Sequence, residues 1–309
     1  MTQQAAVLTG TASVETSSAS AATRDRPDQR SGGRPRRWYL SSAGCAMVLI
    51  GCLVFMVPLI VLILTALQPE NNIISNGPAA VPTSLTLSNF PAAWTTGDLG
   101  KYYVNSALIL LVKVPVGIIV ASLAAYPLTK FRFRARKFVL VLLLIGLGVP
   151  QVITLYPLLQ ISRFTHLDGS IWVLILPYLA FGMPFEILVM RGAFMNVPRE
   201  LIEAARVDGA RERRIWARVC MPLVLPAIAS LAILDGVATW NEFVIALTLL
   251  NSQSNDTLPI GILNLQGQFS TNFAQLTAGV IICVIPMVVL FFLARRYLTK
   301  GVAAGAVKM

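Results

Sequence analysis

A short charged segment between two long apolar runs holds the residues with the most informative chemistry. It consists of Glu203-Ala204-Ala205-Arg206-Val207-Asp208-Gly209 and is followed by Val219, Met221 and Pro222. The Glu203 carboxylate can accept a charge-assisted hydrogen bond from an arginine of another protein. Ala204 and Ala205 are small, so a second surface can approach them closely. The segment therefore predicts a docking element for a soluble partner.

The same segment has the start and stop signals of a helix. Asn196 is the expected N-cap, Pro198 lies in the first turn, and Glu200 favours the positive end of the helix dipole. The helix should run to about Asp208 and end at Gly209, where left-handed backbone costs least. One face would carry Leu201, Ala204, Ala205 and Asp208. The alternative is a helix lying on the bilayer, which the scarcity of large apolar side chains disfavours.

Four charged residues lie inside apolar runs, where burial in lipid is costly: Lys113, Glu186, Asp235 and Glu242. Glu186 is near the inner end of its run, where its carboxylate can extend to the membrane surface. For the others, two interpretations stand equally. One is a polar wall of a solute path, formed by Asp235, Thr239, Asn241 and Glu242. The other is a set of interhelical bonds that fix packing, for instance to a second membrane subunit.

Other chemistry is disfavoured by what the sequence lacks. No G-x-x-x-x-G-K-[ST] phosphate loop is present, and residues 301–308, the nearest approach, have the wrong spacing. The single histidine, His166, has no further ligands nearby in sequence for a zinc site. We therefore expect no catalytic residue, no metal site and no cofactor in this chain.

Composition shows what must position these residues. Hydrophobic residues make up 56% of the chain, charged residues 13%, and the mean hydropathy is +0.70, which soluble domains of this length do not show. Segments in lipid must satisfy their own backbone hydrogen bonds, so the spans should be helices. The sequence predicts an all-α polytopic membrane protein with six transmembrane helices, at about 44–67, 105–128, 138–160, 170–190, 221–250 and 274–294.

Basic residues predict the orientation. They cluster before the first span, between the second and third, between the fourth and fifth, and after the sixth, whereas the other loops hold only Lys101 and Arg163. The positive-inside rule then places both termini and the loop 191–220 in the cytoplasm. The basic residues would also contact anionic membrane lipid. Nucleic acid is not an expected partner, because no basic soluble module is present.

The chain divides into two expected parts. Residues 1–37 are rich in small and polar residues and then in arginine, proline and glycine, so they predict a disordered cytoplasmic tail. A signal peptide fits poorly, because the first apolar run has spanning length. Residues 38–309 form the expected transmembrane domain, with sizeable outer loops at 68–104 and 251–273.

The spacing of Glu203-Ala204-Ala205, Gly209, Val219, Met221 and Pro222 resembles the "EAA" motif of ABC importer permeases. Over about residues 40–309 the chain resembles the smaller permease of maltose-type carbohydrate importers. Three more segments carry this resemblance: Trp240-Asn241-Glu242-Phe243, Thr257-Leu258-Pro259-Ile260-Gly261, and the tail from Gly301 to Gly305-Ala306-Val307-Lys308. Departures are Met221 for the usual leucine, and Val302-Ala303-Ala304 in the tail.

The resemblance implies a type I ABC importer permease fold in the bacterial cytoplasmic membrane. It implies four kinds of partner: a second permease, two ATPase subunits that bind ATP and Mg, an extracytoplasmic solute-binding protein, and a sugar or sugar-like substrate. Coupling to the ATPase would fall to Glu203, Ala204, Ala205, Asp208 and Gly209. This chain would be a non-catalytic subunit. In the maltose system the larger permease holds most sugar contacts.

The resemblance also implies that part of the outer loop 251–273 reaches into the binding protein. The expected tip consists of Leu265, Gln266, Gly267, Gln268, Phe269 and Ser270. The amide and hydroxyl side chains of this loop suit hydrogen bonds to a protein surface or to sugar hydroxyls. The alternative is a solvated connector between two spans.

Two other functional classes remain open. The first is an ABC importer permease for a non-sugar solute, such as a polyol, a glycerophosphodiester or a peptide. The second is an ion-coupled secondary transporter, which would usually show more spans arranged as repeated halves. Dependence of transport on ATP or on an ion gradient separates the second class from the first.

Overall fold

The computed structural model describes residues 42–78, 80–267 and 271–306. The predicted tail, residues 1–37, lies outside them, so its disorder stays a prediction. The chain divides within its first helix into two units, Met1–Val54 and Phe55–Met309, and every functional feature below lies in the second. Throughout the described ranges the regular elements are helices and no strand occurs, which confirms the all-α class.

Four helices in the described part are long and apolar enough to cross a membrane unbroken. They are α1 (Ser42–Ala66), α4 (Leu99–Lys130), α7 (Ile175–Met195, preceded by the turn η2, Ile171–Leu174) and α14 (Phe273–Ala306). They correspond to the predicted spans 44–67, 105–128, 170–190 and 274–294. The last helix continues well past its predicted end.

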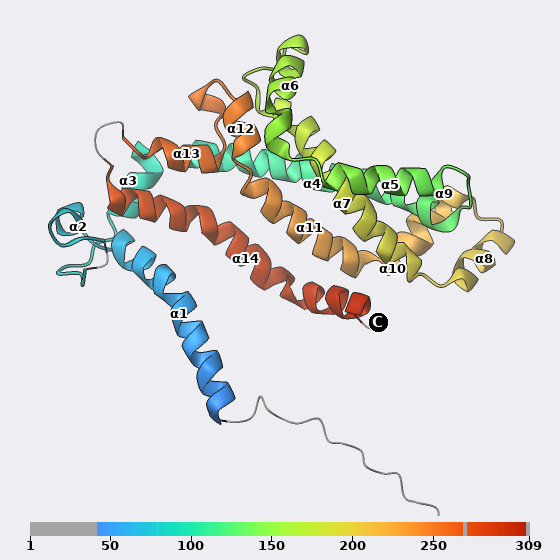
Figure 1. Cartoon of the computed structure of the whole chain (residues 1–309), viewed down its shortest axis with the longest axis horizontal. Helices are drawn as coiled ribbons and strands as arrows, with labels where there is room; N and C mark the ends of the chain where they lie inside the picture. The colour runs from blue at the N-terminus through green and yellow to red at the C-terminus, as the bar shows by residue number, and fades with distance from the viewer. Residues whose placement is uncertain (1–41, 79, 268–270, 307–309) are drawn as a thin grey trace, which may run out of the picture. The chain divides into compact units, whose positions relative to one another are not determined.

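The predicted span 138–160 is a bent pair of helices, α5 (Arg136–Leu147) and α6 (Gln151–Phe164), with an angle of 97° between them. Figure 1 shows α6 pointing away from the line of α5. The bend falls at Gly148-Val149-Pro150. The proline ring disfavours helical backbone at Val149, and Pro150 has no N–H to donate. The six predicted spans are reached when each bent pair counts as one.

The second bent pair replaces the predicted span 221–250. Its first half consists of α9 (Glu212–Ile215), the π-helical turn η3 (Trp216–Cys220) and α10 (Met221–Leu223), and its second half is α11 (Leu225–Trp240). The two halves meet at 77°. Pro226 has no backbone N–H, so it cannot donate the hydrogen bond to the carbonyl of Pro222 that a continuous helix would contain. A second break at residues 241–243 precedes α12 (Val244–Leu249).

Short helices fill the segments between spans. They are α2 (Glu70–Asn76), α3 (Asn89–Thr96), α8 (Arg199–Val207), η4 (Gln253–Asn255) and α13 (Leu258–Asn264). The Asn89 amide donates to the carbonyl oxygens of Ala66 (2.8 Å) and Gln68 (3.0 Å). Glu70 accepts a hydrogen bond from the backbone N–H of Ala274 (2.9 Å), at the start of α14. The predicted outer loops are therefore folded segments held against the spans.

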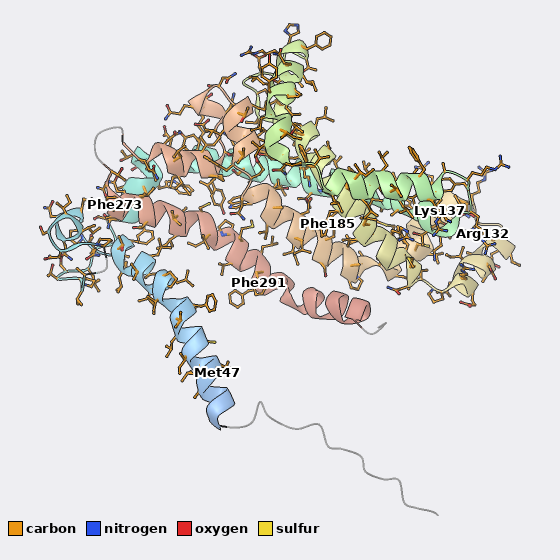
Figure 2. The ribbon with its side chains drawn as sticks, in the orientation of Figure 1. Met47, Arg132, Lys137, Phe185, Phe273 and Phe291 are labelled. Carbon is orange, nitrogen blue, oxygen red and sulfur yellow. The ribbon has the colours of Figure 1, made fainter. Side chains whose placement is uncertain are left out.

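Helix α4 is the centre of the packing, because it contacts α7, α11, α3 and α13. Buried clusters lie along its length: Tyr102 packs with Trp240 and Leu258 near one end, and Tyr126 packs with Phe194 near the other. Many large apolar side chains on the helices remain exposed, as Figure 2 shows for the outer surfaces. Such a surface suits lipid as the solvent.

The two ends of the spans differ in chemistry. Figure 2 places Arg132 and Lys137 at one end, where α4 ends and α5 begins, and Phe273 at the other, where α14 begins. Helix α8 lies at the same end as the basic residues (Figure 1). The docking segment and the basic loop 131–136 therefore share one side of the molecule.

Candidate coupling helix and translocation cavity

The docking segment forms α8 (Arg199–Val207), and Gly209 follows it with a φ of +76°. The left-handed turn predicted at Gly209 is confirmed. The predicted N-cap, Asn196, is wrong: α7 runs on to Met195, and the Asn196 side chain donates to the carbonyl of Gly192 (3.2 Å) at the end of that helix. Pro198 then disfavours helical backbone at Val197, so the new helix starts after the proline.

Helix α8 has a buried and an exposed side. Ile202 is only 3% exposed, and it packs with the half-buried Ala205 against the cluster around Tyr126. The exposed side carries Leu201, Glu203, Ala204 and Asp208. Of the predicted docking face, Ala205 therefore belongs to the buried side. Ile202 is not among the residues predicted for this face, although its position three residues before Ala205 is the helical spacing that indicates a shared face.

Polar contacts tie α8 to the end of α4. The Arg206 Nε donates to Glu212 (2.7 Å), and the Tyr126 hydroxyl donates to the other oxygen of the same carboxylate (2.7 Å). Lys130 donates to the carbonyl of Val197 (3.0 Å), just before α8 begins. A force on α8 can therefore reach α4 through Glu212. The sequence gives no signal for these contacts, because the partners are not at helical spacing.

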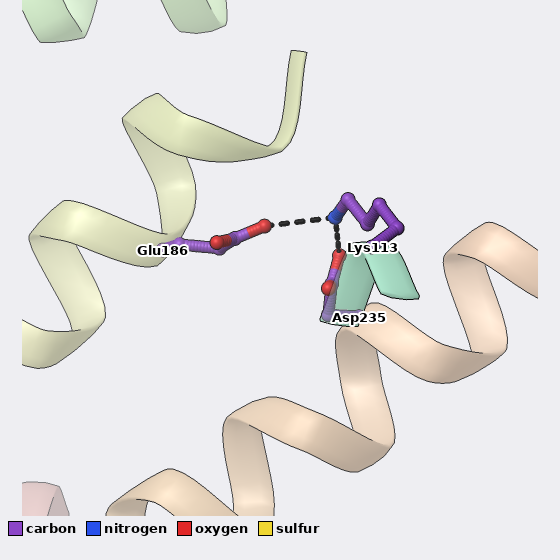
Figure 3. A network of polar contacts seen from close by, with 3 residues as sticks. All are labelled: Lys113, Glu186 and Asp235. Atoms are coloured by element: carbon purple, nitrogen blue, oxygen red, sulfur yellow. Dashed lines mark hydrogen bonds and ion pairs between the residues drawn. The ribbon is translucent and has the colours of Figure 1, made fainter. Parts of the chain in front are cut away.

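Three of the charged residues inside the spans form one buried cluster, shown in Figure 3. Lys113 of α4 donates to Glu186 of α7 (2.8 Å) and also to Asp235 of α11. Their exposed fractions are 2%, 0% and 7%. The expectation that Glu186 extends to the membrane surface is therefore wrong. Asp235 does make an interhelical bond, and its partner lies within this chain.

In this cluster one cation pairs with two carboxylates. Within the described residues, the second oxygens of Glu186 and Asp235 are buried and have no hydrogen-bond partner. The helices approach closely here, because Gly117 of α4 lies against the Glu186 carboxylate of α7 and Gly182 of α7 lies against the Lys113 ammonium group of α4. Since a buried charge without its partner is strongly unfavourable, Lys113 holds three helices together.

The close approach at Gly117 gives a testable expectation. In Gly117→Ala, the new methyl carbon would lie 2.6 Å from a Glu186 oxygen, so the ion pair must shift. We expect a loss of about 1–3 kcal/mol of stability, as for other overpacked cores, measured by thermal unfolding of the purified protein in detergent. Gly192→Ala is the matched control, because nothing lies within 4 Å of the added carbon. Equal stability of the two variants would contradict the expectation.

A cavity of about 220 Å³ opens beside the cluster. Its polar lining comes from Lys113, Gln151, Tyr178, Asp235, Thr239 and Glu242. The cavity therefore brings together three of the four residues predicted for a solute path. The fourth, Asn241, is exposed, does not line the cavity, and donates to the carbonyl of Val237 (2.8 Å).

Glu242 also has a structural task. Its carboxylate accepts hydrogen bonds from the Tyr178 hydroxyl (2.5 Å) and from the backbone N–H groups of Ile245 (2.8 Å) and Ala246 (3.1 Å). It thus satisfies free donors at the start of α12, as a helix cap does. The second break in the predicted fifth span, at residues 241–243, therefore lies within the Trp240-Asn241-Glu242-Phe243 segment. Trp240, before the break, donates to the carbonyl of Cys283 in α14 (3.1 Å).

The predicted outer tip is only partly free. Leu265 is half-buried and packs against Gly97 and Gly279, so it anchors the start of the predicted tip. The neighbouring Gln266 and Gly267 are exposed. The rest of the predicted tip, Gln268, Phe269 and Ser270, lies outside the described residues.

The segment before this predicted tip forms a groove of about 700 Å³. Its polar lining includes Asn251, Ser252, Gln253, Asn264 and Gln266. Asp256 also lines the groove, and burial raises the pKa of its carboxyl, while the Asn264 amide, which donates to it (2.8 Å), acts in the opposite direction. Hydrogen bonds from Asn105 to the carbonyls of Ser254 (3.2 Å) and Asp256 (3.0 Å) hold this segment to α4. These contacts disfavour a plain solvated connector.

The chain is similar in sequence to known membrane transport proteins. Residues 113–304 match the family model described as binding-protein-dependent transport system inner membrane component. The chain is 31% identical to the Probable ABC transporter permease protein YurM of Bacillus subtilis, over 89% of this chain and 92% of that protein. It is 34% identical to the arabinooligosaccharides transport system permease protein AraQ of Halalkalibacterium halodurans, over 81% and 90%.

Among solved structures, the fold is similar to a chain of a bacterial ABC transporter involved in the import of the acidic polysaccharide alginate. The TM-score is 0.73 at 19% sequence identity, over 82% of this chain and 95% of that chain. This similarity confirms the type I importer permease fold expected from the sequence. The match to the family model covers more than half of the chain. The chain therefore belongs to the family of inner membrane components of binding-protein-dependent transport systems, the permeases of ABC transporters.

Proposed function

We propose that this chain is one of two permease subunits of an ATP-driven importer for a sugar or sugar-like solute. The observation that carries the proposal is the exposed helix α8, which ends at Gly209 and is tied through Glu212 to the spanning helix α4. Support for a sugar comes from the relative named for arabinooligosaccharides and from the resemblance of the 240–243 segment to sugar permeases.

The proposed assembly contains a second permease, two ATPase subunits and an extracytoplasmic solute-binding protein. The ATPase subunits would bind ATP and Mg, and this chain would perform no covalent chemistry. We place α8 and both termini in the cytoplasm and the complex in a bacterial cytoplasmic membrane. The basic residues beside α8 support this orientation through the positive-inside rule.

Coupling would begin at α8. Glu203, Ala204, Asp208 and Gly209 present an exposed surface to the ATPase, while Ala205 anchors the helix from its buried side. When ATP closes the ATPase dimer, α8 would move with it. The bonds from Arg206 and Tyr126 to Glu212 would pass that motion to α4. Because Lys113 joins α4 to α7 and α11, the three helices would respond together.

The solute would pass the cavity beside this cluster. Asp235, Thr239 and Glu242 offer oxygen atoms there, and Gln151 adds an amide. Carboxylate and hydroxyl oxygens can accept hydrogen bonds from the hydroxyl groups of a sugar. Asn241 is exposed outside this cavity, and we propose that it contacts the second permease.

The outer groove and its free tip are the proposed contact with the binding protein. Gln266 and Gly267 are exposed beside the groove, and Gln268, Phe269 and Ser270 follow them. We expect deletion of residues 267–270 to leave assembly and basal ATP hydrolysis intact, because Leu265 still anchors the segment. The deletion should remove both the stimulation of ATP hydrolysis by sugar-loaded binding protein and the uptake of sugar. The measurement uses the complete transporter reconstituted in liposomes.

The same preparation tests the substrate class. Uptake of labelled oligosaccharide into the liposomes should require ATP in the lumen, on the side of the ATPase subunits. It should persist without an ion gradient. Competition by a polyol, a glycerophosphodiester or a peptide, with none by sugars, would overturn the sugar assignment. Uptake driven by an ion gradient alone would overturn the ATP-driven class. Unchanged stimulation in the deletion variant would leave the outer tip without the proposed role.

A further inference from the structure

A second hollow lies beside α8 and is separate from the cavity beside Lys113. Its volume is about 420 Å³, and it lies between the end of α4, the basic loop 131–136 and α8. Five cationic side chains line it, and the one carboxylate in the lining is Glu203. The cations are Lys130, Arg132, Arg136, Arg199 and Arg206. Five positive charges against one negative charge leave a formal excess of four.

Most of this charge is available to a ligand. Within the described ranges, Arg132, Arg136 and Arg199 form no side-chain hydrogen bond or ion pair. Lys130 uses one donor on the carbonyl of Val197, which holds its stem in place. Arg206 uses its Nε on Glu212 and keeps its terminal nitrogens. Guanidinium groups bind phosphate oxygens through paired hydrogen bonds, so the cluster suits a phosphate.

Apolar side chains mark this hollow as a membrane-surface site. In the loop, arginines alternate with the exposed Phe131 and Phe133, and Phe138 is exposed at the start of α5. Phe131 and Met195 line the hollow together with the cations. Aromatic and apolar groups beside cations match the two chemistries of a phospholipid at the boundary of headgroup and acyl chain. Inorganic phosphate has no apolar group that could pack against these side chains.

We propose that this hollow binds the phosphate headgroup of an anionic phospholipid of the inner leaflet. The loop arginines Arg132 and Arg136 and the α8 arginine Arg199 would hold the phosphate from opposite sides. The lipid would thereby brace α8 against the end of α4. The proposal relies on the cytoplasmic orientation proposed above, but lipid retention is measured separately from transport.

The test compares two double variants of the complete purified transporter. Arg132→Ala/Arg136→Ala removes two cations that line the hollow. Arg134→Ala/Lys137→Ala removes two cations from the same segment that do not line it. Both variants are placed in nanodiscs of phosphatidylcholine with increasing phosphatidylglycerol, and retained phosphatidylglycerol is counted by native mass spectrometry. At about 1 kcal/mol per arginine, the first variant should bind roughly thirtyfold more weakly. The second should bind within a few-fold of wild type.

Each outcome decides the proposal. Equal loss in the two variants would mean diffuse attraction to the basic loop and would overturn a built site, as would equal retention. A further arm adds inorganic phosphate at millimolar concentration to wild-type nanodiscs. Displacement of the lipid by inorganic phosphate would show a general anion site and overturn the lipid assignment. Thermal stability and bound ATPase, measured for both variants, confirm that the comparison is made on folded complexes. Sugar uptake is measured independently and tests the proposed function instead.

Discussion

Replacing Lys113 by methionine should unfold the transmembrane bundle or prevent its assembly. The substitution leaves Glu186 and Asp235 buried with no cation between α4, α7 and α11. Breaking a buried ion pair from one side typically costs about 3–5 kcal/mol, a large share of the roughly 5–15 kcal/mol that holds a folded domain together. We expect little protein in the membrane and a strongly lowered unfolding temperature for what remains.

Two further variants separate charge from volume. Lys101→Met changes an exposed lysine of the same helix and should be close to wild type. The triple variant Lys113→Met/Glu186→Gln/Asp235→Asn removes every charge of the cluster and should recover most of the lost stability, because no unpaired charge is left. If Lys113→Met proves as stable as Lys101→Met, the cluster does not hold the helices together.

Replacing Gly209 by valine should abolish transport while leaving the transmembrane bundle intact. Gly209 has a φ of +76° with no atom within 4 Å of an added carbon, so the conflict is with the backbone and not with packing. A β-branched residue strongly resists this conformation. The end of α8 should therefore change direction, and the ATPase should bind weakly or hydrolyse ATP without uptake. Glu203→Ala should act in the same direction by removing the charged contact to the ATPase.

The measurements are membrane insertion, ATPase retention on purification, and ATP-driven uptake by the reconstituted complex. Gly192→Val is the matched control, since Gly192 also has open space around it but lies in helical backbone. Gly209→Asn should retain much of the uptake, because asparagine tolerates left-handed backbone. Wild-type uptake in Gly209→Val would show that this turn does not belong to the coupling element.

The sequence by itself determined the class of this protein and the place of helix α8. Lipid leaves apolar segments no conformation but the helix, so α1, α4, α7 and α14 follow from composition alone. The turn at Gly209 follows from a local backbone preference. The bend before α6 also has a local cause, because Gly148-Val149-Pro150 disfavours a continuous helix. The high hydropathy of the surrounding residues instead predicted one unbroken span.

Only the tertiary structure decided which polar groups meet. Glu186 lies near the C-terminal end of its apolar run, yet it is fully buried, because Gly117 of α4 leaves room for its carboxylate. Leu265 lies in a polar segment between two spans, yet it packs against Gly97 and Gly279. These positions depend on contacts between residues distant in sequence. Hydropathy and helical spacing describe one segment at a time, so they predict its conformation but not the partner that its side chains find.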